Sequence, residues 1–205
     1  MNPSIAIITR LSFDKPFIEN QRERFSEYIN SLKFQINNEF TVYLLMDSVR
    51  NFKGCEENKK IVSRFIKGDE RFKIQDTERF QYDIEVRLDF DDRISEVFTL
   101  DLLKAYKETK DNSIVSYQPT IIDCNTGDLY HNPLTYGRSN PSMCMALIQK
   151  GIKNFGVYDR PHNFMSQETG YEVIVRPEGF FFLQVHGENT LSQLPSKEYR
   201  YFKAP

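Results

Sequence analysis

The chain has 205 residues, of which 40% are hydrophobic and 14% aromatic, so it can bury the core of one domain. Its formal net charge is -2, and its basic residues are scattered along the chain. Duplex nucleic acid requires a broad positive face, so we expect no nucleic-acid partner and a single domain over residues 1–205.

The N-terminal segment and the cysteines bear on the cellular compartment. Near the N-terminus only Ile5–Ile8 form an apolar run, which is far shorter than a signal-peptide core or a membrane span. Cys55, Cys124 and Cys144 are odd in number and contain no CxxC pair, which argues against a disulfide framework or a zinc site. We therefore expect a cytoplasmic protein without a membrane span.

The first half of the chain predicts alternating strands and helices. Runs typical of buried strands occupy residues 4–10, 41–46, 72–75 and 82–89. Apolar residues at helical spacing occupy residues 17–34, 56–68 and 95–110. Strand, helix and strand in this order form a βαβ unit, so this half predicts an α/β core.

The pattern changes in the second half of the chain. Residues 113–131 contain two strand-like runs around the turn signal Asn125–Gly127, which predicts a hairpin. Residues 140–151 predict a short helix, and residues 171–189 predict two strands joined by a turn. The expected fold class is therefore α/β, a mixed sheet flanked by helices, with an antiparallel C-terminal addition.

Three aspartates, Asp89, Asp91 and Asp92, stand at the end of the strand-like run at residues 82–89. Side chains alternate along a strand, so Arg87 and Asp89 share one face, and Asp91 joins them if the extended form continues. Open α/β sheets bind ligands in the crevice at the carboxyl ends of their strands. We expect these side chains at the active-site edge of the sheet.

Carboxylates a few Å apart repel one another unless a cation compensates their charge. Mn2+ and Mg2+ prefer oxygen ligands, and substrate phosphates commonly complete their coordination shell, so Asp89 and Asp91 predict a metal-bound diphosphate. The alternative is structural: Asp91 or Asp92 would cap the helix that begins near Ser95. Asp89 would then pair with Arg87 as an ordinary ion pair. We favour the combination in which Asp92 caps this helix while Asp89 and Asp91 bind the metal.

Three segments together resemble a known family. VRLDFDD follows a buried strand, SLKFQINNEFTVYLLMDS precedes it, and FFFLQVHGEN comes late in the chain. In this order they resemble the rhamnosyltransferase family of GT-A-like glycosyltransferases, from Arg10 to about Asn189. The resemblance implies a GT-A-like, Rossmann-like fold, with residues 1–110 binding a nucleotide sugar and residues 111–205 completing the acceptor and metal sites. The family commonly carries a tryptophan before its last strand, where this chain has Phe180–Phe182.

The resemblance also implies roles for individual residues. Asp89, Asp91 and Asp92 match the carboxylates that hold a nucleotide-sugar diphosphate through a divalent metal. Arg87 matches the arginine before them, as a contact to the bound donor. His186 looks like the late-chain histidine that several GT-A enzymes supply as a further metal ligand; the alternative is a histidine hydrogen-bonded at a strand end.

Two residues are candidates for the catalytic step. His162, in YDRPHNFM, matches a family histidine by position, and metal contact, acceptor binding and packing are its alternative roles. An inverting transfer also needs a base near the acceptor hydroxyl. Asp159, in VYDRPH, is the candidate base with Glu188 behind it, and a surface carboxylate is the alternative for either.

Two further residues are candidates for donor binding, because each ends a predicted strand. Arg10 ends the first strand, where a fixed guanidinium suits a diphosphate or the edge of a nucleotide base. Its alternative is a surface arginine. Asp47 ends the second strand, where by analogy with other nucleotide folds it would accept a hydrogen bond from a ribose hydroxyl.

These observations predict a metal-dependent glycosyltransferase with Mn2+ or Mg2+ as its cofactor. It would move a sugar from a UDP or dTDP sugar to a saccharide hydroxyl, and the resemblance implies rhamnose as the sugar. One alternative is another metal-phosphate enzyme, such as a nucleotidyltransferase or a phosphohydrolase; the other is a non-catalytic carbohydrate-binding module. The chain lacks the Gly-rich opening loop of the nucleotidyltransferases, and its first strand ends in ITR rather than in a nucleophilic aspartate.

Overall fold

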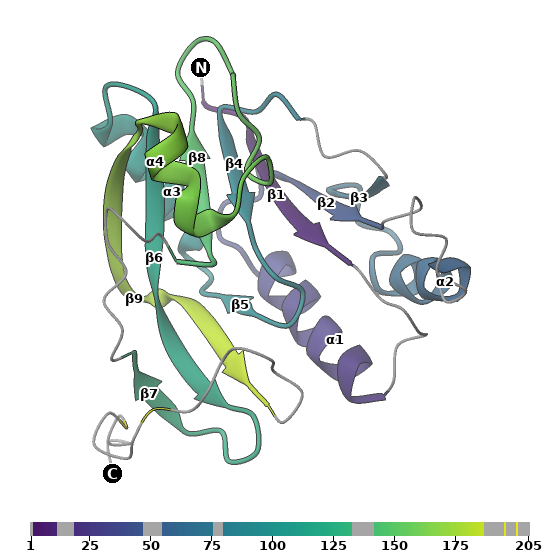
Figure 1. The fold of residues 1–205 in the computed structure, drawn as a ribbon. Helices are drawn as coiled ribbons and strands as arrows, with labels where there is room; N and C mark the ends of the chain where they lie inside the picture. The colour runs from purple at the N-terminus through teal and green to yellow at the C-terminus, as the bar shows by residue number, and fades with distance from the viewer. Residues whose placement is uncertain are drawn as a thin grey trace.

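The nine strands of the described residues form one sheet with helices packed against it (Figure 1). The computed structural model describes residues 2–11, 19–46, 55–75, 80–132, 142–186, 195 and 200. The strands are β1 (Ile5–Arg10), β2 (Thr41–Leu45), β3 (Phe72–Gln75), β4 (Ile84–Arg87), β5 (Arg93–Ile94), β6 (Ser113–Asp123), β7 (Leu129–His131), β8 (Met145–Ile148) and β9 (Glu172–Val185). The helices are α1 (Glu19–Lys33), α2 (Cys55–Phe65), α3 (Phe98–Glu108), the short 3-10 helix η1 (His162–Phe164) and α4 (Met165–Thr169). The strand order is β3-β2-β1-β4-β8-β6-β9-β5, and β7 pairs with β6 beside this path.

The first half of the chain forms the parallel part of the sheet, as the sequence predicts. β2 and β4 run parallel to β1, and β3 runs parallel to β2. Parallel neighbours need crossover connections, and α1 and α2 lie in the connections that follow β1 and β2. The carboxyl ends of β1, β2 and β4 therefore lie at the same edge of the sheet.

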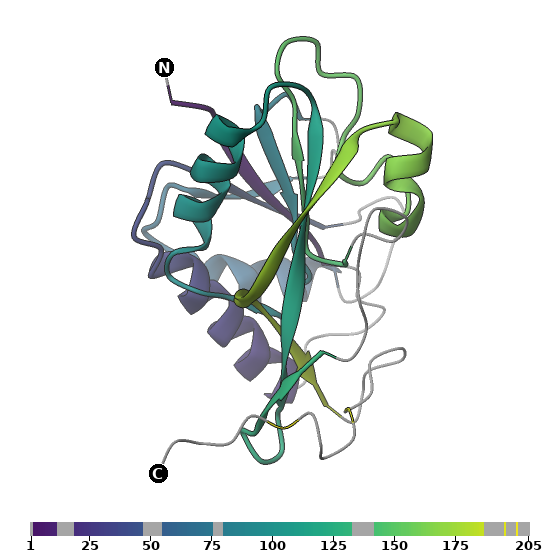
Figure 2. The same ribbon diagram turned by 90° about the vertical axis from the view of Figure 1, so that its left-hand side faces the viewer.

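The helices α1, α2 and α3 pack on one face of the sheet. One core cluster joins Phe25 of α1, Val62 of α2 and Phe98 of α3 to Val86 of β4. A second cluster contains Met165 of α4, together with residues of the opposite face. Figure 2 shows α1 and α3 on one side of the sheet and α4 on the other. In the described part of the chain, no helix is long and apolar enough to cross a membrane.

The helix predicted over residues 140–151 is wrong, because Met145–Ile148 form the strand β8. β8 runs antiparallel between β4 and β6, and all four of its residues are buried. Four apolar residues in a row have no period that separates a strand from a buried helix. The two neighbouring strands decide the outcome, because each of them hydrogen-bonds one edge of β8.

β9 is one long bent strand, where the sequence predicts two. It pairs in parallel with β6 up to Arg176, and pairing resumes at Phe181 after a register shift. Gly179, within this stretch, has a φ of 97°, which residues with a side chain rarely adopt. Beyond the bend β9 also pairs antiparallel with β5. The C-terminal addition is therefore mixed, with a parallel β6–β9 pair among antiparallel ones, and the bend carries the end of β9 toward the segment that follows β4.

The hairpin predicted around residues 113–131 is confirmed as the antiparallel pair of β6 and β7. The carboxylate of Asp123 accepts hydrogen bonds from the amide of Asn125 at 2.9 Å and from the hydroxyl of Thr126 at 3.0 Å. Gly127 completes the turn with a φ of 73°. Such local hydrogen bonding is why Asx and Gly residues predict turns from sequence.

Candidate active site

The segment between β4 and β5 carries the three aspartates at the carboxyl end of β4. β4 ends at Arg87, and the amide of Asp92 donates a hydrogen bond to the carbonyl of Asp89 across 3.3 Å. The chain therefore turns through residues 89–92, which we call the acid turn. The extended form does not continue to Asp91, so this residue reaches the sheet edge through a turn and not through strand alternation.

The acid turn meets the end of β9 at Asp91. Nε2 of His186 lies 3.2 Å from Oδ2 of Asp91, and the two side chains are 10% and 22% exposed. The side-chain amide of Gln184 donates a hydrogen bond to the carbonyl of Asp91 at 2.6 Å. The structure thus brings together two residues, 95 positions apart, that the sequence nominates separately as metal ligands.

Asp92 is buried against β9. Its relative exposure is 2%, and its Oδ1 accepts a hydrogen bond from the backbone amide of Gln184 at 3.1 Å. Burial, reinforced by the negative charges of Asp91 and Asp89, holds the pKa of Asp92 well above its usual range. The predicted helix cap is wrong, because β5 lies between Asp92 and the helix. α3 begins at Phe98, and within the described residues its N-terminus has no side-chain cap.

Two arginines lie near Asp89 and share one aromatic ring. Burial raises the pKa of Asp89; the positive charge of Arg87 opposes this, Asp91 adds to it, and Arg10 opposes it further. The guanidinium carbons of Arg10 and Arg87 lie 4.3 Å and 4.9 Å from the ring centre of Tyr158. Both distances are within the range of cation–π attraction. The two arginines are therefore held on one ring near the half-buried carboxylate of Asp89.

Tyr158 and the buried Glu85, which is hydrogen-bonded to the residue before Tyr158, are parts of the site that were not predicted from the sequence. The Tyr158 hydroxyl donates a hydrogen bond to the carbonyl of Ile8 at 3.2 Å, and the amide of Val157 donates one to Oε2 of Glu85 at 3.2 Å. Glu85 is fully buried, and this burial raises its pKa to about 7, against the amide hydrogen bonds from Val157 and Tyr82. A carboxylate inside the apolar run IEV is the available signal, because a buried charge needs partners.

His162 and Asp159 are close in sequence but lie in different surroundings. His162 begins η1, and burial followed by the positive charge of Arg87 lowers its pKa, so the imidazole is neutral at neutral pH. Asp159 is exposed, and its carboxylate accepts a hydrogen bond from a backbone amide of its own turn at 2.8 Å while lining a separate pocket of about 450 Å³. His162 therefore responds to the charge of Arg87, whereas Asp159 lines the separate pocket. Asp47 and Glu188 lie outside the described residues.

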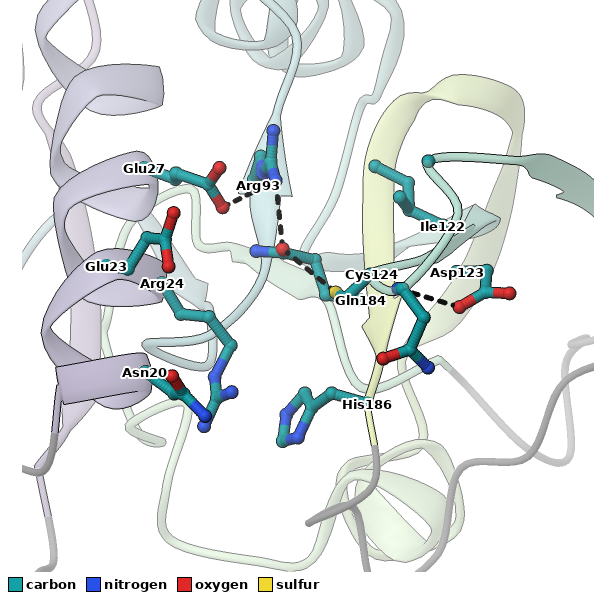
Figure 3. A pocket seen from close by; sticks show the side chains of 12 residues that line it. Asn20, Glu23, Arg24, Glu27, Arg93, Ile122, Asp123, Cys124, Gln184 and His186 are labelled. Carbon is teal, nitrogen blue, oxygen red and sulfur yellow. Dashed lines mark hydrogen bonds and ion pairs between the residues drawn. The ribbon is translucent and has the colours of Figure 1, made fainter.

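A cleft of about 640 Å³ lies between α1, β5, the β6–β7 hairpin and the end of β9, and His186 lines it (Figure 3). In its wall, Nη2 of Arg93 donates hydrogen bonds to Oε2 of Glu27 at 2.5 Å and to Oε1 of Gln184 at 3.0 Å. Gln184 also contacts Asp91 through its own amide. Side-chain hydrogen bonds therefore run from the cleft to the acid turn.

Solved structures share this arrangement of strands and helices. The chain matches S. aureus TarS 1-349 in complex with UDP-GlcNAc with a TM-score of 0.56 and 11% sequence identity, covering 96% of this chain and 63% of that one. It matches the mannosyltransferase PcManGT from Pyrobaculum calidifontis, in complex with GDP-Man and Mn2+, with a TM-score of 0.58 and 12% identity, covering 97% of this chain and 59% of that one. The fold is GT-A-like.

This agreement confirms the predicted fold class. At 11% and 12% identity the likeness is one of fold alone, and the chain spans less than two thirds of the length of either protein. No protein-family model matches the chain, and no curated protein matches it in sequence. The residues at the carboxyl edge of the GT-A-like sheet therefore carry the functional inference.

Asp91 and His186 are the pair at this edge that suits a metal ion. Across the residues that the structure describes, no group of three or more histidine, cysteine or acidic side chains is placed to hold one. A carboxylate oxygen and an imidazole nitrogen 3.2 Å apart supply two ligands. Mg2+ commonly takes one or two protein carboxylates and completes its shell with phosphates and waters, so a site with few protein ligands fits such an ion.

Proposed function

We propose that the chain is a metal-dependent glycosyltransferase that moves a sugar from a nucleoside diphosphate to a saccharide hydroxyl. The observation that carries the proposal is the geometry of the acid turn. Nε2 of His186 lies 3.2 Å from Oδ2 of Asp91, and the positive charges of Arg87 and Arg10 act to lower the pKa of Asp89. Metal ligands next to fixed positive charges suit a metal-bound diphosphate. The two similar structures are complexes with UDP-GlcNAc and with GDP-Man and Mn2+, which supports the same class of donor.

Asp91 and His186 would hold the divalent ion, Mn2+ or Mg2+, with Asp89 as the neighbouring carboxylate. When bound, such an ion stabilises the negative charge on the leaving diphosphate. Asp92 takes a different role from the ligand role that its motif implies. Its Oδ1 is hydrogen-bonded to the backbone of Gln184, two residues before His186, so it fixes the strand end that presents the imidazole.

Arg10 and Arg87 would bind the phosphate oxygens of the donor. Both guanidinium groups lie on the ring of Tyr158 before the donor binds. The two side chains therefore lose little conformational freedom when they contact its phosphates. The Nε of Arg87 is buried and has no hydrogen-bond partner among the described residues. A buried donor without a partner calls for an acceptor, and phosphate oxygens are strong acceptors for a guanidinium. Asp47 would accept a hydrogen bond from the ribose, by analogy with other nucleotide folds.

His162 is our candidate for the base that takes the proton from the acceptor hydroxyl. Burial and the charge of Arg87 lower its pKa, so the imidazole is neutral and able to accept a proton near neutral pH. The effect of Arg87 also indicates that His162 lies near the proposed diphosphate site. Asp159 is the alternative base, with one of its oxygens already hydrogen-bonded within its own turn.

The identity of the donor rests on the sequence resemblance. We expect a UDP or dTDP sugar, and the family resemblance of RLDFDD implies rhamnose as the sugar. A cytoplasmic location is an expectation of the same kind. Because the donor is inferred from sequence alone, the binding experiment includes several nucleotides.

The proposal is tested by nucleotide binding in the presence of Mn2+. In a thermal-shift panel of UDP, dTDP, GDP and their sugars, we expect UDP or dTDP to raise Tm, because a ligand present at ~100-fold excess over Kd stabilises the folded state by about 2.7 kcal/mol. Asp91→Asn should abolish the shift, because it removes a charged metal ligand. Asp111→Asn, at an exposed aspartate between α3 and β6, is the matched control and should shift like the wild type. An equally large shift in Asp91→Asn contradicts the proposal.

Product analysis separates the alternative functions. Glycosyl transfer from a sugar nucleotide releases a nucleoside diphosphate, whereas nucleotidyl transfer releases pyrophosphate. A non-catalytic carbohydrate-binding module releases neither and does not respond to nucleotide with Mn2+. Pyrophosphate release, or saccharide binding without any nucleotide response, would replace our proposal with one of these functions.

A further inference from the structure

The cleft beside His186 is large enough for a small ligand and is lined by polar side chains. Its volume of about 640 Å³ lies within the usual range of small-molecule sites, roughly 300–1,000 Å³. Figure 3 shows Asn20 and Arg24 of α1 and His186, which directly follows β9, pointing into the space between α1 and β9. Glu23 lines the same space from α1. A ligand in this cleft would therefore be surrounded by hydrogen-bonding groups on several sides.

The charges in the cleft leave no surplus for a phosphate group. Arg93 is paired with Glu27 at 2.5 Å. Both oxygens of Asp123 accept hydrogen bonds within the β6–β7 turn. Glu23 and Arg24 also line the cleft and carry opposite signs. A strongly anionic ligand would lack the fixed positive charge that phosphate recognition requires.

The lining is equally unsuited to a hydrophobic ligand. Among the described residues that line the cleft there is no phenylalanine, tyrosine or tryptophan, and Ile122 and Cys124 make its apolar part. The polar groups match hydroxyls instead. The carboxylate of Glu23 accepts hydrogen bonds, the guanidinium of Arg24 donates them, and the amide of Asn20 does both. Hydroxyl groups also donate and accept, so a neutral saccharide fits this set.

We propose that this cleft is the acceptor subsite and that it takes a neutral saccharide. The inference rests on the proposed glycosyltransferase function and deepens it. His186 lines the cleft and lies 3.2 Å from Asp91, so a saccharide bound there has hydroxyl groups next to the acid turn. Gln184 accepts a hydrogen bond from Arg93 in the cleft wall and donates one to the carbonyl of Asp91. Gln184 therefore links the cleft wall directly to the acid turn.

Two substitutions of Glu23 test the subsite. Glu23→Trp places an indole in the cleft from an exposed position of α1, and Glu23→Gln removes one charged acceptor while keeping the shape. Saturation-transfer NMR, with UDP and Mn2+ present, measures binding of the methyl glycosides of glucose, galactose, mannose, N-acetylglucosamine and rhamnose. We expect at least one glycoside to bind the wild type, to bind Glu23→Gln roughly tenfold more weakly, and not to bind Glu23→Trp. Glu19→Trp and Glu19→Gln, on the same helix but not in the described lining, should bind like the wild type.

The Tm shift with UDP and Mn2+ reports on the proposed function separately. Loss of glycoside binding in Glu23→Trp with an intact UDP shift supports the acceptor subsite. Glycoside binding that Glu23→Trp leaves unchanged overturns it, and so does a wild type that binds no glycoside. Glycoside binding that is lost in Glu23→Trp, in a protein that shows no UDP shift, refutes the glycosyltransferase and leaves the cleft as a saccharide site.

Discussion

Asp89 and Asp91 are two residues apart in the chain but lie in different surroundings. Asp89 is half-buried near Arg10 and Tyr158, and desolvation raises its pKa. Asp91 pairs with His186, which lines the cleft, and 22% of its side chain is exposed. One side of the acid turn therefore faces two arginines on a buried aromatic ring, and the other faces polar side chains at an open cleft.

The two sides are held by different interactions. On the Tyr158 side, an aromatic ring and the buried carboxylate of Glu85 fix the backbone and the arginines when the chain folds. On the His186 side, the position of Asp91 depends on side-chain hydrogen bonds through Gln184. Substitutions on the Tyr158 side should have the larger effect on the free energy of unfolding, whereas those on the His186 side should act more on the Tm shift with nucleotide and metal.

The largest effect is expected for Tyr158→Ala, which removes a side chain that is only 9% exposed. Large-to-small substitution of a buried aromatic residue costs about 3–5 kcal/mol, and both arginines lose their common ring. Urea unfolding measures the free energy of unfolding. Tyr158→Phe is the control, because it keeps the ring and removes only the hydrogen bond to Ile8, at a cost of about 1 kcal/mol. If the two variants are equally stable, the ring does not organise this side.

An intermediate effect is expected for Gln184→Leu. Gln184 is 1% exposed, and its side chain hydrogen-bonds to Arg93, Cys124 and the carbonyl of Asp91. Replacing it with leucine removes these hydrogen bonds at a cost of about 2 kcal/mol. The Tm shift with UDP and Mn2+ should shrink as well, since Asp91 loses its support. Cys124→Ala removes only the 3.4 Å contact to the same amide and should shift like the wild type. A full nucleotide shift in Gln184→Leu would show that the His186 side does not depend on this residue.

The smallest effect is expected in the pH dependence of stability, through Glu85. Its pKa in the folded protein, about 7, lies above the ordinary 4.5, so the folded state binds this proton more tightly than the unfolded chain does. Its contribution to stability is fully present below pH 4.5 and is lost as the pH rises to 7. Between about pH 7 and pH 5, lowering the pH should therefore stabilise the wild type relative to Glu85→Gln by on the order of 1 kcal/mol. Urea unfolding across this range measures the difference. Glu96→Gln, at an exposed position, is the control and should show the same pH dependence as the wild type. If the free energy of unfolding of Glu85→Gln also changes with pH as it does in the wild type, the raised pKa of Glu85 is contradicted.

Elements with a clear period could be predicted from sequence. The apolar stripe Phe25, Ile29 and Leu32 predicts the buried face of α1, and all three side chains are buried. Phe98 and Leu102 do the same for α3. A period of about four residues places these side chains on one helix face whatever the helix packs against, so the information is local.

Elements set by distant partners could not be predicted in this way. The four residues of β8 are a strand because β4 and β6 bind both of their edges. Asp92 looks like a helix cap from its neighbours, yet its carboxylate bonds to Gln184 on β9. Tyr158 belongs to no motif, and Glu85 is marked only by its place in an apolar run; the amide of Val157, next to Tyr158 in the chain, connects the two by its hydrogen bond to Glu85.

The sequence by itself determined the parallel half of the sheet and the position of three aspartates at a strand end, because periodicity and turn chemistry act between neighbouring residues. Only the tertiary structure decided that Asp91 meets His186 across 95 positions, and that Tyr158 gathers two arginines beside Asp89. These contacts depend on the bend of β9 and on the pairing of β4 with β8, which bring remote segments together by burial and hydrogen bonding that no local pattern contains.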